Sequence, residues 1–324
     1  MMVALPAPLR AALDRALEGV SRKGLAERAA RTSDAYRAGQ GSAAVIREAD
    51  DALAYAITRL PATYAACASA LAEAARMAPG FAPASLLDAG VGTGAASWAA
   101  LETWPGLASA TWIDANPIFL ALAARFAELG PAALQAARAE RADLAAAGSW
   151  PKAELVVASY ALAEIAPERQ GATVSGLWDA CEGVLALVEP GTPAGYGRIL
   201  AARAALIEAG AQVLAPCPHA RACPLVGDDW CHFSVRLPRS RDHRLAKGAE
   251  VPFEDERFSY LIAARPGVAS APPTARVIAS PRTGKPGIEL KLCTPDGVEH
   301  RVVGKRDKAA FAVARRLDWG DAIG

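Results

Sequence analysis

The chain has 324 residues, 52% of them hydrophobic, and a formal net charge of +1. It can therefore bury a sizeable core as one large domain or two ordinary ones. Charged residues interrupt its Ala-rich apolar stretches, which excludes the run of about 20 apolar residues that crosses a bilayer. Six cysteines without a secretory signal argue against a disulfide framework and favour free, catalytic or metal-binding thiols. We expect a cytoplasmic protein that is monomeric when it is not bound to another molecule.

Residues 1–80 are predicted to form a helical domain. The Arg-rich start resembles a transit peptide, but acidic residues interrupt it at Asp14, Glu18, Glu27 and Asp34. Apolar residues then recur at helical spacing up to Met77. Pro79, Gly80 and Pro83 indicate a boundary near residue 80.

Residues 81–265 alternate between strand and helix patterns, which predicts a parallel sheet covered on both faces. Strands are expected at 85–90, 109–114, 134–139, 154–160, 183–189, 211–215 and 257–264. Helices are expected at 94–103, 116–129, 168–182 and 195–209. The fold class is therefore α/β, a Rossmann-like seven-stranded sheet, with a cysteine-rich basic insertion at 216–250. Residues 266–324 read as a small β appendage, with strands at 276–279, 288–293 and 300–303 and a final helix.

A glycine-rich loop follows the first predicted strand. Asp88 ends the apolar strand, and Gly90, Gly92 and Gly94 lead into helix formers. Glycines let the backbone approach a ligand closely, and the free N–H groups of a helix start can donate to it. The pattern predicts a nucleotide-type cofactor site, against the simpler interpretation of a tight strand-to-helix turn.

Further acidic and polar residues are predicted to complete this site. Asp114 ends the second strand, where a carboxylate can accept hydrogen bonds from both ribose hydroxyls. Asp143 follows the third strand and could accept from an adenine amino group, and Ser159 ends the fourth. A nicotinamide or flavin dinucleotide remains the alternative, because Ala95 can replace the last glycine of that fingerprint. Asp88 favours S-adenosylmethionine, because the cationic methionine end of this cofactor suits a nearby carboxylate. A dinucleotide would instead place two phosphates near Asp88.

Four cysteines of the C-terminal third form a candidate metal site. Cys217, Cys223 and Cys231 fall within the insertion, and Cys293 in the appendage could complete a tetrahedral set. Zinc is the default ion, but its ligands usually come in closely spaced pairs. Cys followed by Pro, seen twice, favours a 4Fe-4S cluster. The remaining cysteines, Cys67 and Cys181, read as buried small hydrophobes.

A dense run of basic residues lies in the same insertion and predicts phosphate binding. Residues 217–324 contain 18 Lys and Arg against 13 Asp and Glu, a bias typical of a nucleic-acid surface. The acidic residues 254–256 follow this run, so internal pairing is the alternative. The candidate RNA-binding residues are Arg236, Arg239, Arg241, Arg244 and Lys247.

Several segments together resemble the methyltransferase-like assembly factors of the mitochondrial ribosomal small subunit and their bacterial relatives. They are Arg59 to Ala66, Leu87 to Gly94, Val188 to Thr192, Cys217 to Tyr260, Cys293 to Gly297 and Trp319 to Asp321. The resemblance implies a class I methyltransferase fold that binds S-adenosyl-L-methionine, and a 4Fe-4S cluster on the four cysteines. It also implies that the small ribosomal subunit or its rRNA is the partner.

The resemblance does not imply methyl transfer. Amino-directed methyltransferases carry an Asn/Asp-Pro-Pro-aromatic tetrad after the fourth strand, and here the position reads Ser159-Tyr160-Ala161-Leu162. No cysteine lies there to attack a pyrimidine ring. Tyr160 and Glu164 could line a substrate pocket, with Glu164 as a base, but a carboxylate at a helix start is the favoured interpretation of Glu164. Two hypotheses follow: an rRNA methyltransferase, and a non-catalytic assembly or translation factor.

Overall fold

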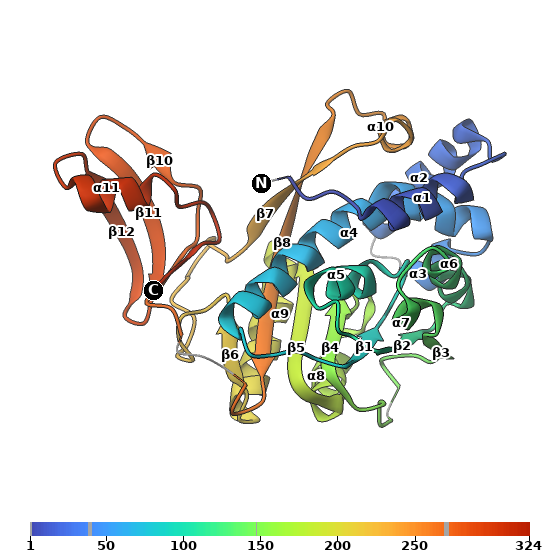
Figure 1. Cartoon of the computed structure of the whole chain (residues 1–324), viewed down its shortest axis with the longest axis horizontal. Coiled ribbons are helices and arrows are strands. Elements are labelled where there is room, and N and C mark those ends of the chain that lie inside the picture. The colour runs from blue at the N-terminus through green and yellow to red at the C-terminus, as the bar shows by residue number, and fades with distance from the viewer. Residues whose placement is uncertain (1, 38–40, 147, 269–271) are drawn as a thin grey trace.

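The structure is a computed structural model that describes residues 2–37, 41–146, 148–268 and 272–324. It consists of an α/β body and a smaller β unit at its side (Figure 1). In the described part of the chain, no helix is both long and apolar enough to cross a membrane.

A mixed sheet forms the centre of the body, in the order β3-β2-β1-β4-β5-β8-β6. The neighbours from β3 to β5 run parallel, whereas β8 is antiparallel to both β5 and β6. This order, with one antiparallel strand near the end, is that of class I S-adenosylmethionine-dependent methyltransferases, so the predicted fold class is confirmed. The strands are β1 (Ser85–Ala89), β2 (Ser109–Asp114), β3 (Arg138–Arg141), β4 (Ala153–Ser159), β5 (Cys181–Pro190), β6 (Gln212–Ala215) and β8 (Phe253–Ala264).

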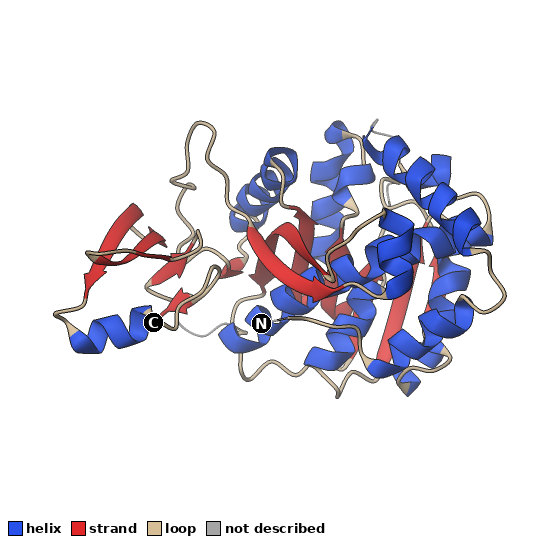
Figure 2. Cartoon of the chain, turned by 90° about the horizontal axis from the view of Figure 1, so that it is seen from above, coloured by secondary structure: helices blue, strands red, loops and turns tan. Residues whose placement is uncertain are grey.

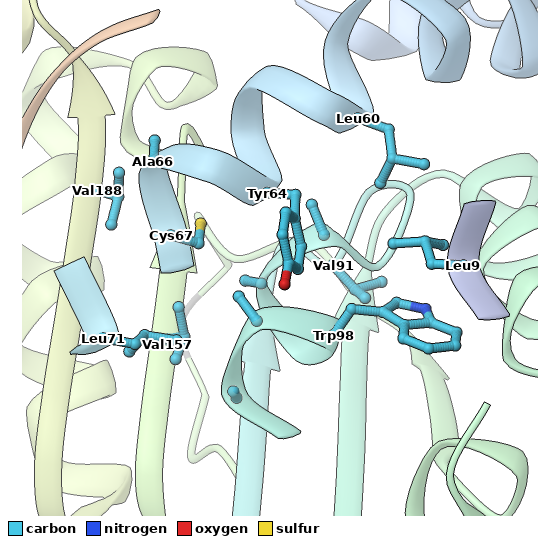
Figure 3. Packing of buried hydrophobic residues seen from close by; sticks show 14 of the residues in the cluster. Leu9, Leu60, Tyr64, Ala66, Cys67, Leu71, Val91, Trp98, Val157 and Val188 are labelled. Carbon is cyan, nitrogen blue, oxygen red and sulfur yellow. The ribbon is translucent and has the colours of Figure 1, made fainter. Parts of the chain in front are cut away.

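Helices cover both faces of this sheet because alternate strand residues point to opposite faces. Leu86 and Val157 share one core with α4 and α5, whereas Leu87 and Val156 share the other with α8 and α9. Figure 3 shows Leu71 of α4 beside Val157 of the sheet. The covering helices are α5 (Ala95–Thr103), α6 (Pro117–Ala127), α7 (Ala132–Gln135), α8 (Pro167–Ala180) and α9 (Pro193–Glu208), with a 3-10 turn at Leu162–Glu164.

The N-terminal segment is helical, as predicted, and lies over the first face of the sheet. It contains α1 (Ala7–Ala16), α2 (Arg22–Arg37), α3 (Ser42–Val45) and α4 (Ala49–Met77). A capping box of Glu48 and Asp51 begins α4. Leu60, Ala66 and Leu71 of α4 are fully buried in one core with strand residues. The division of the chain at residue 80 stays a prediction.

The insertion contains two elements that the sequence analysis missed, β7 (Phe233–Pro238) and α10 (Arg241–Lys247). β7 pairs antiparallel with the first half of β8, which extends beyond the rest of the sheet. In Figure 1 this ribbon rises from the sheet and carries α10 at its tip. At this position α10 contacts α2, and Arg22 of α2 forms an ion pair with Asp242 of α10 at 2.9 Å.

The appendage is a second sheet in the order β10-β11-β9-β13, with β12 paired to β11. It lies apart from the helix-covered body (Figure 2). Its elements are β9 (Ala275–Val277), β10 (Arg282–Thr283), β11 (Gly287–Thr294), β12 (Gly297–Gly304), α11 (Lys308–Ala314) and β13 (Ala322–Ile323). Ile288, Leu290 and Leu292 form its small core. The strands and the final helix expected in the appendage are confirmed.

One strand of the body was predicted wrongly. A strand was expected at 134–139, but α7 occupies the first half of that range and β3 begins at Arg138.

Candidate functional site

The glycine loop connects β1 to α5 in the predicted strand-turn-helix arrangement. Gly90, Gly92 and Gly94 have φ values of 80°, 51° and 84°, which favour glycine. A Cβ at Gly90 would lie 2.9 Å from the Cβ of Ala161, so the loop contacts the segment after β4. Gly94 is the residue before the first turn of α5. The loop therefore lies at the carboxyl edge of the sheet, where ligands bind in open α/β folds.

Asp88 is fully buried beneath this loop, against α5. Its Oδ2 accepts from Ser97 Oγ at 2.6 Å, and Ser97 Oγ in turn accepts from Trp112 Nε1 at 3.0 Å. Burial raises the pKa of Asp88 to about 7, although the hydrogen bond from Ser97 opposes this. Among the described residues Oδ1 has no hydrogen-bond partner. A buried carboxylate oxygen without a donor is what a cationic ligand group would satisfy.

Replacing Asp88 with Asn is expected to stabilise the ligand-free protein at neutral pH. Between about pH 4 and 7 the unfolded chain ionises this carboxyl while the folded chain keeps its proton, so stability falls as pH rises. Asp88→Asn removes this loss, a gain of up to roughly 4 kcal/mol at pH 8. Urea unfolding at pH 4, 6 and 8 measures it, with the exposed Asp143→Asn as control. If the unfolding free energy of Asp88→Asn at pH 8 is equal to or lower than that of the wild type, burial does not destabilise the ionised Asp88 carboxylate.

Asp114 joins the loop to the second strand. Its Oδ2 accepts from the Gly92 amide at 2.8 Å and its Oδ1 from the Asn116 amide at 2.8 Å. Burial raises its pKa, and the two amide hydrogen bonds oppose that shift. The Asn116 side chain donates to the Ile46 carbonyl oxygen at 3.0 Å, which fixes the segment before α4 above the site. The two residues predicted from separate strands, Asp88 and Asp114, are thus brought to one loop.

The other two predicted cofactor residues lie around the same edge. Asp143 is exposed, and its Oδ1 accepts from the Ala145 amide at 2.8 Å in the turn after β3. Its neighbour Leu144 would lie 3.4 Å from a Cβ at Gly90. Ser159 ends β4, where the Cys67 thiol contacts it from α4. All members of the predicted set therefore surround the glycine loop, and their roles toward a cofactor stay predictions.

A cavity of about 820 Å³ lies between α2, α4, α10 and the segment after β4. Tyr160 lines it with a φ of 58°, an uncommon conformation for a residue with a side chain. Its hydroxyl donates to Glu256 Oε1 at 2.8 Å, and Arg59 pairs with the same carboxylate at 3.0 Å. Glu164, also in the lining, accepts from the Ser42 amide at 3.0 Å and hydroxyl at 2.5 Å. Tyr160 and Glu164 therefore line the same cavity, and both hydrogen-bond within the protein; a substrate role for the cavity stays a prediction.

The four predicted metal ligands together line a second cavity, although Cys293 comes from the appendage and the other three from the insertion. Cys217, Cys223 and Cys231 lie in loops without regular secondary structure, whereas Cys293 lies in β11. The Tyr196 hydroxyl lies 3.0 Å from Cys223 Sγ, and His219 Nε2 lies 3.7 Å from Cys293 Sγ. The structure thus brings together thiols that are up to 76 residues apart in sequence.

Two buried arginines line this cavity. Arg203 donates to the His219 carbonyl oxygen at 2.6 Å, and Arg276, with none of its surface exposed, donates to the carbonyl oxygen of Pro216 at 2.7 Å. Arg203 Nε and Arg276 Nη2 have no hydrogen-bond partner among the described residues. Glu73 pairs with Arg276. No carboxylate is among the described residues that line the cavity, so Arg203 has no acidic partner in the lining.

Burial raises the pKa of three of these thiols, those of Cys217, Cys231 and Cys293, and so favours their neutral form. Burial raises the pKa of Cys293 to about 12 and that of Cys231 further, and the neighbouring cysteines add to both shifts. Arg203 and Arg276 oppose the shift at Cys217 and Cys293. Across the described ranges, no three Cys, His, Asp or Glu side chains form a site for a metal ion. Cys67 and Cys181 are buried elsewhere, as expected.

The predicted RNA-binding residues differ in their partners. Arg236 forms a two-pronged ion pair with Asp255 at 2.7 and 2.8 Å. Arg239 and Lys247 both pair with Glu254, at 3.2 and 2.6 Å. Burial tends to raise the pKa of Glu254, but the nearby His243 ring, whose Nε2 lies 3.1 Å from Oε2, and the hydrogen bond from Lys247 hold it well below its usual range. Arg241 is exposed and Arg244 half-buried on α10.

The sequence pattern does not reveal the charged pairs found at both cavities. Arg59, Glu256 and Arg276 have partners about 200 residues away in the chain, so no local pattern reveals them. Glu189, 1% exposed at the end of β5, was also missed; it pairs with Arg198 at 2.6 Å and accepts from the Leu162 amide. An acidic residue inside a strongly apolar strand was the available signal.

Comparison with known proteins gives one family. A family model described as mitochondrial small ribosomal subunit Rsm22 matches residues 49–324. The human protein named ribosome assembly protein METTL17, mitochondrial, is 29% identical over 297 residues. The match covers 84% of this chain and 62% of the human protein, so the chain spans less than two thirds of that relative.

Two of the solved structures that are similar to the chain are named as methyltransferases. The N-methyltransferase NodS from Bradyrhizobium japonicum matches with a TM-score of 0.43 and 11% identity, covering 65% of this chain and 90% of that chain. The magnesium protoporphyrin IX methyltransferase from Synechocystis matches with a TM-score of 0.41 and 16% identity, covering 63% and 83%.

Proposed function

Because this chain belongs to the mitochondrial small ribosomal subunit Rsm22 family, we propose that it is an assembly factor of the small ribosomal subunit that binds S-adenosyl-L-methionine and a 4Fe-4S cluster. The observation that carries the proposal is the meeting of four cysteines and two buried arginines in one cavity beside a methyltransferase-type sheet. The partner is the subunit's rRNA. The cytoplasmic location and the monomeric state stay predictions.

The residues of the glycine loop fit S-adenosylmethionine. Asp88 offers a carboxylate oxygen without a donor to a cationic group, and Asp114 can accept from ribose hydroxyls while it orients Gly92. In a dinucleotide site the Asp88 carboxylate, at the end of β1, would lie near two phosphates, which disfavours the dinucleotide alternative. When bound, the cofactor would supply an activated methyl group.

Replacing Asp114 with Ala is expected to weaken S-adenosylmethionine binding about 10- to 100-fold, because hydrogen bonds to a charged group contribute about 1.5–3 kcal/mol. Isothermal titration with S-adenosylmethionine and with its demethylated product measures the loss. Asp296→Ala, in the exposed turn of the appendage, is the matched control. Equal affinities of the two variants would refute the assignment of Asp114 to the cofactor.

The cysteine cavity fits an iron-sulfur cluster in charge and in ligand set. Four thiolates around a 4Fe-4S core carry net negative charge, which the guanidinium group of Arg203 would partly compensate, whereas Arg276 is already paired with Glu73. The cavity is only about 30 Å³, so loading requires the thiols to move outward. Three of the four lie in loops, outside helices and strands. Zinc remains the alternative, with His219 close to Cys293.

Methyl transfer is the alternative that an experiment has to decide. Tyr160 and Glu164 are engaged with Glu256 and Ser42, which favours a non-catalytic factor in which cofactor and cluster stabilise the fold. Single-turnover transfer of labelled methyl groups onto immature small subunits tests this directly. Incorporation into rRNA supports the enzyme, and no incorporation with any assembly intermediate excludes it.

A further inference from the structure

The basic residues of the insertion are largely neutralised by the acidic residues that follow them. Arg236, Arg239 and Lys247 pair with Asp255 and Glu254 along the β7–β8 ribbon. An RNA phosphate would have to compete with these carboxylates for the same guanidinium and ammonium groups. The insertion is therefore less cationic in the folded protein than in the sequence.

The appendage shows the opposite behaviour. Residues 272–324 contain 10 Lys and Arg against 6 Asp and Glu. Seven of these cations are exposed and have no carboxylate within ion-pair distance among the described residues. They are Arg282, Lys285, Lys305, Arg306, Lys308, Arg315 and Arg316.

The topology gathers most of these cations at one end of the second sheet. Gly287 pairs with Gly304 in the β11–β12 ladder, which places Lys285 beside the turn that carries Lys305 and Arg306. Two acidic residues adjoin these cations. Asp307 follows Arg306 and caps α11 by accepting from the Ala310 amide at 3.0 Å, and Glu289 lies opposite Arg282 in the β10–β11 ladder. The cations are therefore in excess at this end.

We propose that this end of the appendage, which we term the appendage patch (Arg282, Lys285, Lys305, Arg306 and Lys308), is the principal surface for the phosphate backbone of RNA. The inference rests on the proposed function for the identity of the RNA. Exposed Lys and Arg side chains without partners gain most from phosphates, because binding releases counterions and breaks no ion pair. The shared cysteine cavity ties the appendage to the body, so the cluster would hold the patch in place.

Three charge-reversed pairs of residues test the proposal, each changing the net charge by four. The appendage variant is Lys305→Glu with Arg306→Glu, and the insertion variant is Arg236→Glu with Arg241→Glu. The control is Lys23→Glu with Arg125→Glu, exposed residues of α2 and α6 on the far side of the body from the appendage (Figure 1). Binding of the loaded full chain to transcribed small-subunit rRNA is measured between 0.05 and 0.3 M salt.

We expect the appendage variant to bind about tenfold or more weakly at low salt, with a slope of log affinity against log salt reduced by about 1 to 2. The control should lose much less. A larger loss in the insertion variant than in the appendage variant overturns the inference while the RNA partner stands. Equal affinity of the appendage variant and the wild type for rRNA also overturns it, and would assign the patch to a protein. If the wild type binds no rRNA, the proposed function itself fails.

Discussion

Replacing Arg276 with Met is expected to lower the free energy of unfolding by about 3 kcal/mol. Arg276 is fully buried and joins three parts of the chain, because it pairs with Glu73 of α4 and donates to the carbonyl oxygens of Pro216 and Gly320. Removing one partner of a buried pair leaves the other charge and the carbonyl oxygens poorly satisfied. Urea unfolding of the anaerobically purified protein measures the loss.

Arg301→Met is the matched control for this variant. Arg301 belongs to the same appendage, but it is exposed and pairs with Glu299 in water, so we expect a change within about 0.5 kcal/mol. If both variants lose the same small amount, Arg276 does not connect the appendage to the body. In Arg276→Met, Glu73 keeps one cationic partner, Arg76, at 2.7 Å. The expected loss of unfolding free energy is therefore at the lower end of the range for a broken buried ion pair.

Replacing Cys231 with Ser is expected to abolish the absorption of an iron-sulfur centre near 400 nm and to lower the melting temperature by roughly 10 °C. The thiols of this cavity come from both the insertion and the appendage, so a cluster would cross-link the two. Its binding free energy would then contribute to folding, and a loss of several kcal/mol shifts melting by about this amount in a chain of this size.

Cys181→Ala is the matched control for the cysteine prediction. Cys181 is 1% exposed and packs in the core beneath α8, away from the cavity, and burial raises its thiol pKa to about 11. This variant should keep the full absorption. Loss of absorption in both variants would point to general misfolding rather than to a ligand role for Cys231.

The sheet could be predicted because its signals are local. Ser85 to Gly94 contains an apolar strand, a glycine turn and a helix start in sequence order, and the structure follows it. The alternation of Phe233, Val235 and Leu237 was an equally local signal for β7, but the surrounding cysteines and basic residues drew the interpretation toward a ligand loop. At β3 the exposed, charged strand Arg138–Arg141 has no apolar alternation to mark it.

The charges of both cavities could not be predicted, because they depend on distant pairs. Arg59 meets Glu256 and Arg276 meets Glu73 only after the strand order is established. The same limit applies to the basic run, whose cations look available for phosphates until the β7–β8 register brings Asp255 beside Arg236. The convergence of Cys217, Cys223, Cys231 and Cys293 could be predicted because three of them are close together in the sequence and a metal site needs a fourth ligand.

The metal content of the anaerobically purified protein tests the central claim most directly. The proposal predicts about four iron and four sulfide per chain, with a brown colour and absorption near 400 nm that depend on Cys217, Cys223, Cys231 and Cys293. Stoichiometric zinc without iron, in protein that was never exposed to oxygen, would contradict the iron-sulfur assignment.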